Sequence, residues 1–404
     1  MTPRDVSRSP SRRIRFVGRQ RELAVLDERL EAAARGEGSV VFISGEPGIG
    51  KSRLLAEFAA LAQKAGWLVL AGRAYDTEGM PPYLPLLEAI RQHVGAVGSD
   101  ELLQQLAQGA PEVILIPDQD RGRFAPVAVG LGPGPELERY RLFGGVSAFL
   151  LGLATSAESR GLLLCVDDLH WADRSTLLLF QHLARKLGSA PLLVAGTFRS
   201  TELEQTHPLS SVLAELTRER LQQTITLPAL TPEECAALIS LIAAGPVDAV
   251  VAQTICERTE GNPFFVEEVV RQLMSESRDL ARPEAVAGAW AAPEGVRAVI
   301  SHRVSRLTTS AQRLLQAAAV LGDQVAPELV RAMIELPEDA LVASFEEASA
   351  AGMLREEGAA YVFGHALMRQ VIYDGLSLAR RQQLHARAAE ALESRKGPDP
   401  QSAL

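Results

Sequence analysis

The sequence has few cysteines, and their placement excludes several roles. Only three of its 404 residues are cysteine, and Cys165, Cys235 and Cys256 lie far apart without a Cys-x-x-Cys pair. Each lies in an apolar stretch of sequence. This pattern predicts reduced core residues of a cytoplasmic protein.

The sequence also lacks an apolar run long enough to cross a membrane. Its longest uncharged stretch, LFGGVSAFLLGLATSA at 142–157, has 16 residues and contains glycines and hydroxyl side chains. It is too short and too mixed for a membrane span, and it predicts a buried helix and no membrane partner. The first 16 residues carry five arginines and no secretory signal. We expect 1–13 to be a disordered basic arm, with a docking arm as the alternative.

The sequence also has fewer basic than acidic residues. The chain has 41 Lys and Arg against 50 Asp and Glu, a formal net charge of −9. This balance argues against a general binder of nucleic acid or anionic membranes. Apolar residues make up 47% and charged residues 23%, which is typical of a soluble globular protein, and the length predicts two or three domains.

The first large part of the chain, 14–205, alternates short apolar runs with helical patterns. The runs of strand length are VVFIS (40–44), WLVLAG (67–72), GLLLCVDD (161–168) and PLLVAGT (191–197). Continuous apolarity indicates strands covered on both faces, so the pattern predicts an α/β domain with a parallel sheet. Residues 117–136 are rich in Pro, Gly and Asp and predict a long loop before a helix at 136–153.

The strand runs stop after about 205, and a small helical domain is expected at 206–275. Its first helix has Thr231 as the N-cap, Pro232 in the first turn and Glu234 to complete a capping box. Further helices are predicted at 247–258 and from Pro263. Residues 276–292 are rich in Ala, Gly and Ser and predict a linker.

The last part, 293–395, has the pattern of a winged-helix domain. Helices are expected at 294–306, 309–321, 326–334 and 338–351, followed by a hairpin around Glu357 and Gly358 and a long helix at 365–395. Residues 396–404 are expected to be a tail. No internal repeat is evident.

The segment GEPGIGKS at 45–52 fits the pattern Gly-x-x-x-x-Gly-Lys-[Ser/Thr] between a strand and a helix. Its glycines let backbone N–H groups turn toward phosphate oxygens at the positive end of the helix. Lys51 is predicted to reach the β- and γ-phosphates and the Ser52 hydroxyl to ligate Mg²⁺. The predicted phosphate-binding residues are Gly45, Glu46, Pro47, Gly48, Ile49, Gly50, Lys51, Ser52 and Arg53.

Polar residues end two of the other apolar runs. Asp167, at the carboxyl end of its strand, is predicted to help hold Mg²⁺, and Asp168 to orient or deprotonate the attacking water. The alternative is that both cap the following turn. Because aspartate is one methylene shorter than glutamate, Asp168 favours slow hydrolysis. Thr197 and Arg199 end another run and are predicted to sense the γ-phosphate, with a surface arginine as the alternative.

Together these stretches resemble a known family. FVGRQREL (16–23), GEPGIGKSRLL, LLCVDDLHWADRSTLLLFQHLAR, LLVAGTFR, LPALTPEECAALI, GNPFFVEEVV and FGHALMRQVIYDGL follow in the order found in the STAND class of signalling ATPases. The likeness is strongest to the MalT-like, LuxR-type bacterial regulators and covers roughly 14–395. It implies an AAA-like P-loop domain, a helical lid and a winged helix, in that order.

The resemblance implies further nucleotide contacts. Val17, Gly18 and Arg19 would lie beside the adenine and ribose. Pro263 would pack on the base from the lid, and His365 would contact the β-phosphate of ADP in the resting state. For His365, the alternative is an ordinary helix-capping histidine.

The implied function is a switch that binds ATP or ADP with Mg²⁺, hydrolyses ATP slowly and self-associates in its ATP state. Such regulators normally continue into a repeat sensor and a DNA-binding helix-turn-helix. This sequence stops at Leu404, so DNA contact would need a missing or separate domain. The sequence leaves three alternative functions open: a turnover ATPase, a DNA-binding winged-helix module and a phosphotransferase. Between 293 and 396 there are 12 Lys and Arg against 13 Asp and Glu, which disfavours DNA binding.

Overall fold

The computed structural model describes most of the chain. The residues that it describes are 16–76, 81–96, 113–118, 123–128, 135–156, 159–200, 203, 207–286, 292–322 and 324–396. The predicted arm at 1–13 and nearly all of the predicted tail lie outside them. The chain divides into two compact units. One comprises Arg19–Pro228 and Val342–Glu356, and the other comprises Met1–Gly18, Ala229–Leu341 and Glu357–Leu404.

The first unit is built on a five-stranded parallel sheet in the order β2-β5-β6-β1-β7. The predicted parallel α/β sheet is confirmed. Four of its strands occupy the four apolar runs: β1 (Ser39–Gly45), β2 (Leu68–Arg73), β5 (Leu162–Asp167) and β6 (Leu192–Arg199). Because neighbouring strands are parallel, their carboxyl ends meet at one edge of the sheet.

The fifth strand corrects the expectation that strands stop near 205. β7 (Gln222–Thr226) pairs with β1 at the edge of the sheet. Its sequence, QQTIT, has a single strongly apolar residue, and none of its five residues is fully buried. An edge strand of this kind lacks the continuous apolar pattern by which the other strands were recognised.

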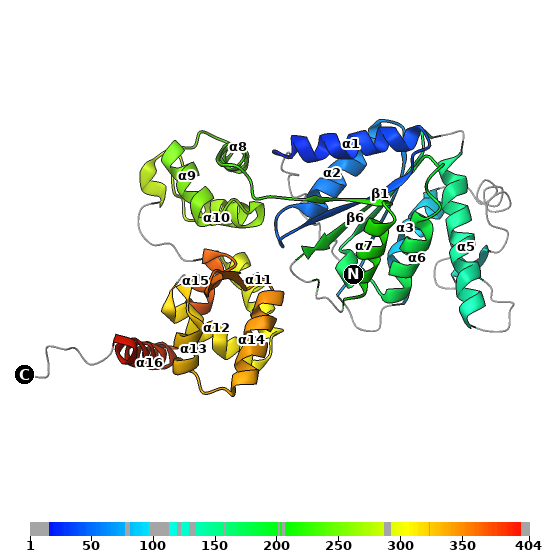
Figure 1. Cartoon of the computed structure of the whole chain (residues 1–404). Coiled ribbons are helices and arrows are strands. Elements are labelled where there is room, and N and C mark those ends of the chain that lie inside the picture. Colours follow the sequence, from blue (N-terminus) through cyan, green and yellow to red (C-terminus); the bar gives the residue numbers. More distant parts are fainter. Residues whose placement is uncertain are drawn as a thin grey trace, which may run out of the picture. The chain divides into compact units, whose positions relative to one another are not determined.

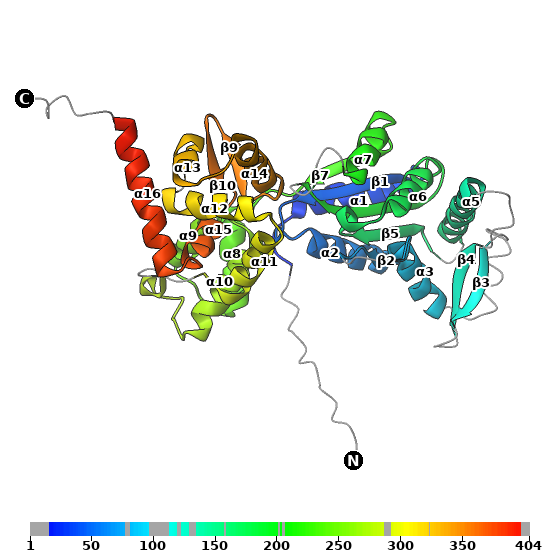
Figure 2. The same ribbon diagram turned by 90° about the horizontal axis from the view of Figure 1, so that it is seen from below.

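Helices cover both faces of the sheet. Figure 1 shows α1 (Gln20–Ala34) and α2 (Lys51–Lys64) on one face. The opposite face carries α3 (Leu84–Ala96), α5 (Pro135–Ala154), α6 (Arg174–Ala184) and α7 (Pro208–Arg218), which Figure 2 shows from below. The alternation of side chains along a strand explains this layering, because every second residue points to the same face.

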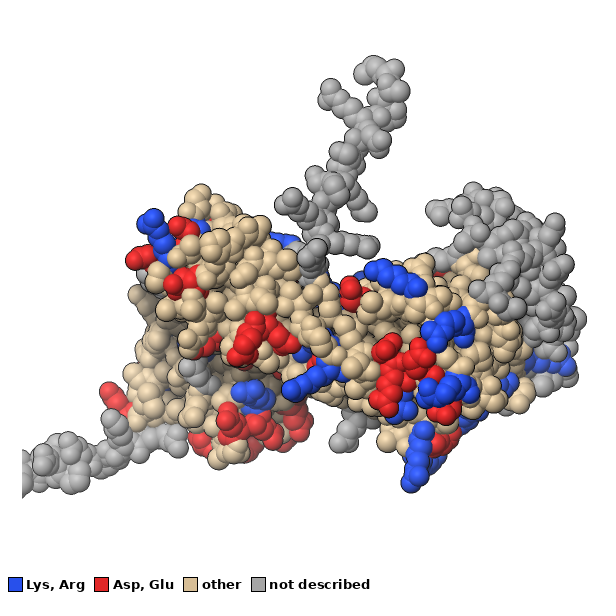
Figure 3. Space-filling model, turned by 90° about the horizontal axis from the view of Figure 1, so that it is seen from above, with Lys and Arg blue, Asp and Glu red and all other residues tan. Residues whose placement is uncertain are grey.

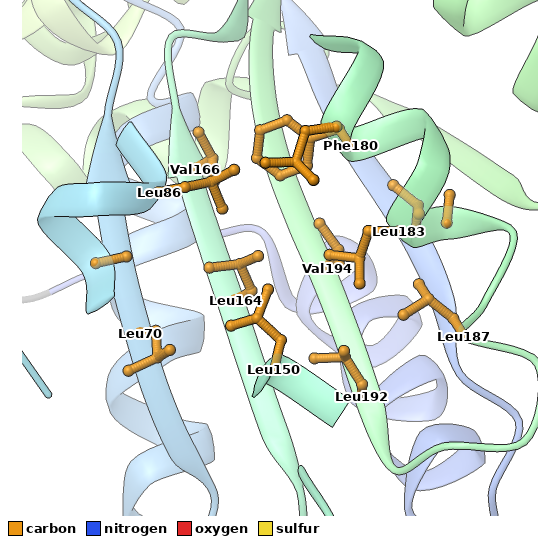
Figure 4. Packing of buried hydrophobic residues seen from close by; sticks show 14 of the residues in the cluster. Leu70, Leu86, Leu150, Leu164, Val166, Phe180, Leu183, Leu187, Leu192 and Val194 are labelled. Carbon is orange, nitrogen blue, oxygen red and sulfur yellow. The ribbon is translucent and has the colours of Figure 1, made fainter. Parts of the chain in front are cut away.

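A large hydrophobic cluster fills the space between the sheet and this second helical layer. Figure 4 shows Leu164 and Val166 of β5 beside Val194 of β6, facing Leu150 of α5 and Phe180 of α6. All five are buried. Burial of a side chain of this size contributes about 1.5–3 kcal/mol, so this cluster fixes the strands that carry the site.

The segment before α5 differs from its prediction. The expected loop at 117–136 contains β4 (Arg123–Ala128), which forms an antiparallel pair with β3 (Val113–Asp118). The stretch 142–157 is largely helical, as expected, and lies mostly within α5. Among the described residues, no helix combines the length and apolarity needed to span a bilayer.

The second unit begins with the helices α8 (Pro232–Ala243), α9 (Ala249–Arg258) and α10 (Pro263–Ser275). The predicted capping box is present, with Thr231 and Glu234 each bonded to the other's backbone N–H. The predicted linker at 276–292 is partly wrong. Leu280, Ala285 and Val286 are buried in the cluster formed by α8–α10, and η3 covers Pro283–Val286.

The remaining elements are α11 (Glu294–Ser305), α12 (Thr309–Leu321), β8 (Gln324–Val325), α13 (Pro327–Met333), α14 (Glu338–Ala350), β9 (Leu354–Glu357), β10 (Ala360–Phe363), α15 (Ala366–Asp374) and α16 (Leu378–Lys396). They match the predicted helices and hairpin strands except for β8, which was not expected, and for the helix at 365–395. Val342–Glu356, which includes most of α14 and of β9, belongs to the first unit. Two helices stand where a single helix was expected. α15 ends at Asp374 with Gly375 as its C-cap, and the Ser377 hydroxyl accepts from the backbone N–H of Arg380 near the start of α16.

The close approach of β2 to α3 yields a test of the packing. A Cβ atom at Gly72 would lie 1.8 Å from the backbone oxygen of Pro85, so the chain must shift to accept alanine. We expect Gly72→Ala to lower the free energy of unfolding by about 1–3 kcal/mol, measured by urea denaturation.

The matched control is Gly144→Ala in α5, where an added Cβ would meet no atom within 4 Å. Alanine is the better helix former, so this variant should gain about 0.5–1 kcal/mol. Equal stability of the two variants would contradict the close approach.

Candidate functional site

The predicted phosphate loop connects β1 to α2 at the carboxyl edge of the sheet. β1 ends at Gly45, and α2 begins at Lys51. Gly45 and Gly50 have φ values of 145° and 101°, which side-chain-bearing residues rarely adopt. An added Cβ at Gly45 would crowd Ile49 and the Leu227 oxygen, whereas at Gly50 it would project into open space. The loop therefore exposes backbone N–H groups at the helix N-terminus, as an anion site requires.

The Lys51 side chain is held at this loop. Its Nζ donates to the carbonyl oxygens of Gly45, at 2.9 Å, and Glu46, at 2.8 Å. The residue is buried, with 6% of its surface exposed. A buried ammonium at a helix N-terminus carries positive charge where phosphate oxygens would bind, so its position suits the predicted role.

Asp167 connects three segments at the strand ends. Its Oδ1 accepts hydrogen bonds from the Ser52 hydroxyl, at 2.8 Å, and from the Thr197 hydroxyl, at 2.6 Å. The Thr197 oxygen in turn accepts from the backbone N–H of Asp168, at 2.9 Å. Residues of α2 and β6 thus converge on the carboxylate at the end of β5.

Asp168 is paired with an arginine from the neighbouring strand. Arg73, the last residue of β2, donates from Nη2 and Nε to Asp168 Oδ2, at 2.7 and 3.1 Å. Asp168 is 4% exposed and has the left-handed backbone conformation, with a φ of 58°. Two bonds from a planar guanidinium fix the orientation of the carboxylate.

The environment of Asp168 makes its carboxylate more basic. Burial raises its pKa, and the charge of Asp167 raises it further, while Arg73 opposes the change. The neighbouring His170 is also buried, which together with the charges of Arg199 and Lys51 lowers its pKa to about 3. His170 is therefore neutral near pH 7 and forms no ion pair with Asp168, although His170 Nε2 lies 4.0 Å from Asp168 Oδ1.

Arg199 lies at the end of β6, as predicted. Its guanidinium carbon is 4.7 Å from the ring centroid of Trp171, which belongs to the short helix η1 (Leu169–Trp171) that follows Asp168. Stacking on an aromatic face orients a guanidinium without removing its charge. The contact places a cation beside the segment that carries both aspartates.

The donor set suits a magnesium nucleotide. Ser52 and Asp167 present hydroxyl and carboxylate oxygens next to each other, and oxygen is the ligand atom that Mg²⁺ prefers. Among the described residues, no group of three or more His, Cys, Asp or Glu could hold a metal. Mg²⁺ is commonly held by one or two carboxylates together with substrate phosphates, so the residues present fit it.

The three residues predicted beside the adenine and ribose lie in different surroundings. Val17 packs against the hydrophobic cluster of α8–α10, and a Cβ at Gly18 would collide with the Glu234 carboxylate. Arg19 is buried and donates to the Ile49 oxygen of the phosphate loop at 3.3 Å. Only Arg19 is seen in contact with the phosphate loop.

The two residues predicted from the second unit have structural roles. Pro263 is the first residue of α10, after the N-cap Asn262. His365 caps α15, accepting from the Leu367 N–H on Nδ1, and its Nε2 lies 2.8 Å from the Thr259 oxygen. A carbonyl only accepts, so Nε2 carries the proton. The contacts agree with the helix-capping alternative, and phosphate contact by His365 stays a prediction.

Sequence reasoning missed Arg73. Arg73 ends a strand run, like Asp167 and Arg199, but the sequence does not say which strands are neighbours. The parallel pairing of β2 with β5 sets Arg73 opposite Asp167 in the register. The available signal was that a polar residue ends each apolar run, which marks such residues as candidates for a site at the carboxyl edge of the sheet.

Removal of the Thr197 hydroxyl tests the hydrogen-bond network. Valine has the same shape but would leave the buried N–H of Asp168 without its acceptor. We expect Thr197→Val to lower the free energy of unfolding by about 1–3 kcal/mol in urea denaturation. Thr224→Val, at an exposed position of β7, should change it by less than about 0.5 kcal/mol. Equal effects would contradict this network.

Comparisons with known proteins agree with this geometry. Residues 15–195 match the AAA ATPase domain family. An uncharacterized protein of Rhizobium meliloti is 27% identical over 406 residues, which cover 95% of this chain and 37% of that protein. The chain thus spans just over a third of the length of this relative.

Two solved structures are similar to the chain. A Walker-type ATPase of Pyrococcus abyssi matches over 91% of this chain and 99% of its own, with a TM-score of 0.60 and 16% identity. A STAND protein with a tetratricopeptide repeat sensor from Pyrococcus horikoshii covers 95% of this chain and 46% of its own at 14% identity, but its TM-score of 0.35 is too low to support an argument. The first match shows a shared fold. Residues 15–195 are therefore similar to the AAA ATPase domain family, and the fold is that of an α/β P-loop NTPase core with a parallel sheet.

Proposed function

We propose that this protein is a STAND-type signalling switch that binds Mg²⁺ and ATP and hydrolyses ATP slowly. The observation that carries the proposal is the pairing of Asp168 with Arg73, beside the Ser52–Asp167 contact. Lys51 and the loop amides would bind the phosphates, and Ser52 and Asp167 would hold Mg²⁺. Bound there, Mg²⁺ would neutralise charge on the phosphates.

Asp168 is the residue proposed to take a proton from the attacking water. Its raised pKa suits a general base, because a more basic carboxylate binds a proton more readily. Arg73 limits this role, since the two bonds to Oδ2 engage the oxygen and restrict the carboxylate's rotation. Slow hydrolysis follows from that restraint together with the short aspartate side chain.

The proposal extends to a transcriptional role. The motifs from FVGRQREL to FGHALMRQVIYDGL resemble the MalT-like, LuxR-type regulators, and the Rhizobium meliloti relative is much longer than this chain. The expected boundary at 205 moves to Pro228, because α7 and β7 belong to the first unit. We assign 14–228 to the ATPase domain, 229–275 to a lid, 276–292 to a connection and 293–395 to a winged helix. The cytoplasm is the proposed location.

The proposed switch needs hydrogen bonds that join the lid to the winged helix. The bond between His365 Nε2 and the Thr259 oxygen joins the start of α15 to the turn before α10, which carries Pro263. Glu260 strengthens this connection by accepting from the Ala366 N–H at 2.9 Å. We propose that ADP favours a closed state and ATP an open, self-associating one, because each nucleotide binds one state better.

The charge distribution gives little support to the DNA-binding alternative. On the face shown in Figure 3, acidic and basic side chains are interspersed. A duplex-binding surface needs a concentration of positive charge. DNA contact is therefore proposed only through a domain outside this sequence.

The nucleotide content of the freshly purified protein tests the switch. Denaturation and chromatography of the released material should give nearly stoichiometric ADP if a closed state retains it. Lys51→Ala should remove bound nucleotide, because the buried ammonium beside the loop is lost. An empty wild-type site with rapid steady-state hydrolysis would contradict the switch and favour the turnover ATPase.

The control is Lys64→Ala, which removes an exposed ammonium at the other end of α2. This variant should keep its nucleotide, since Lys64 lies in the last turn of the helix. Loss of nucleotide from both variants would indicate a general effect on α2 instead of a phosphate contact by Lys51.

Arg73 and Asp168 provide a separate kinetic test. Asp168→Asn should lower kcat about 10²–10⁴-fold with little change in ATP affinity, because only proton transfer is lost. Arg73→Ala should raise kcat, because it frees Asp168 Oδ2, and it should raise the pKa seen in the pH–rate profile. The measurement is steady-state phosphate release across pH. Unchanged kcat in Asp168→Asn would remove this residue from the mechanism.

A further inference from the structure

Two of the three cysteines meet in the second unit, although 20 residues separate them in the sequence. Cys235 lies in the first turns of α8 and Cys256 near the end of α9. Their sulfur atoms are 2.7 Å apart, and both are free thiols. The sequence pattern gave no sign of this pair, because helix packing alone brings α8 and α9 together.

The surroundings of the pair are apolar and closely packed. Both residues belong to the buried cluster of α8–α10 with Ile239, Val251 and Ile255. Burial raises the pKa of Cys235, and the hydrogen bond with Cys256 acts in the same direction. Cys235 is fully buried, whereas Cys256 retains 8% of its surface exposed. Cys256 is thus the more accessible residue of the pair.

We infer that Cys235 and Cys256 are a redox-sensitive dithiol that a peroxide converts into a disulfide joining α8 to α9. A disulfide needs a sulfur–sulfur distance of about 2.05 Å, so closure requires a movement of roughly 0.7 Å from the contact present. The pair needs no nucleotide to react, and the inference is independent of the proposed switch.

The reaction with hydrogen peroxide is balanced by the two thiols alone. The Cys256 sulfur attacks one peroxide oxygen, the O–O bond breaks, and the leaving hydroxide takes the thiol proton and departs as water, so Cys256 becomes a sulfenic acid. The Cys235 sulfur then attacks the sulfenic sulfur, the S–O bond breaks, and a second water leaves as the S–S bond forms. The two sulfurs lose two electrons, and the peroxide gains them.

The position of Cys256 gives the disulfide a structural effect. The Cys256 backbone oxygen accepts from the Gly261 N–H at 3.0 Å and from the Thr259 hydroxyl at 3.3 Å. Thr259 is the residue whose oxygen contacts His365. A disulfide would therefore hold the end of α9 and the turn at 259–262 against α8, and this turn would open less often.

The test uses the full chain, treated with graded hydrogen peroxide and then denatured and alkylated. Peptide mapping should find Cys235 linked to Cys256, with one alkylated thiol left of the three, and dithiothreitol should restore all three. Cys165 serves as the internal control, because it lies buried in β5 of the first unit, whereas the proposed pair belongs to the second unit. Retention of three thiols, or linkage between chains, would overturn the inference.

Two variants and one exchange measurement sharpen the result. Cys256→Ala should form no intramolecular link, whereas Cys165→Ala should still form it. Hydrogen exchange at the Gly261 N–H should slow at least tenfold in the oxidised wild type and remain unchanged in peroxide-treated Cys256→Ala. Unchanged Gly261 exchange in the fully linked protein would overturn the structural effect, and a link formed in Cys256→Ala would overturn the assigned pair.

Discussion

The hydrogen bonds that Asp167 accepts from Ser52 and Thr197 are the constraint on which the site depends. They join the first turn of α2 to the carboxyl ends of β5 and β6, so three segments distant in the sequence share one acceptor atom. The buried cluster beneath the sheet supplies the rigidity that keeps these ends in register. Displacement of any of the three segments would disturb the position of Asp167 relative to the phosphate loop.

The two neighbouring aspartates differ in their hydrogen-bond partners and in their backbone conformation. Asp167 accepts from two hydroxyl groups at Oδ1, and its Oδ2 lies 3.8 Å from Arg73 Nε. Asp168 is buried, has a left-handed backbone and is bound by a guanidinium. Adjacent carboxylates would repel each other if both were bare, so Arg73 reduces that repulsion while it restrains Asp168. One arginine thus offsets the charge of both aspartates and fixes the orientation of Asp168.

Much of the fold and part of the site could be predicted from the sequence, because their signals are local. The apolar runs locate four strands, the Thr231 capping box locates α8, and GEPGIGKS locates the phosphate loop. The polar edge strand β7 and the break at Gly375 gave weak local signals and were missed. Arg73 and the cysteine pair could not be predicted, since strand order and helix packing bring their partners together.

The edge strand β7 also bears on how copies of the chain can associate. It is five residues long, carries glutamine and threonine at four positions, and closes the sheet beside β1. A short polar edge offers little that another strand could extend, and natural sheets use such edges to prevent uncontrolled stacking. Growth of the sheet at this edge is thereby discouraged, so any ordered association of copies would have to use side-chain surfaces instead of this strand.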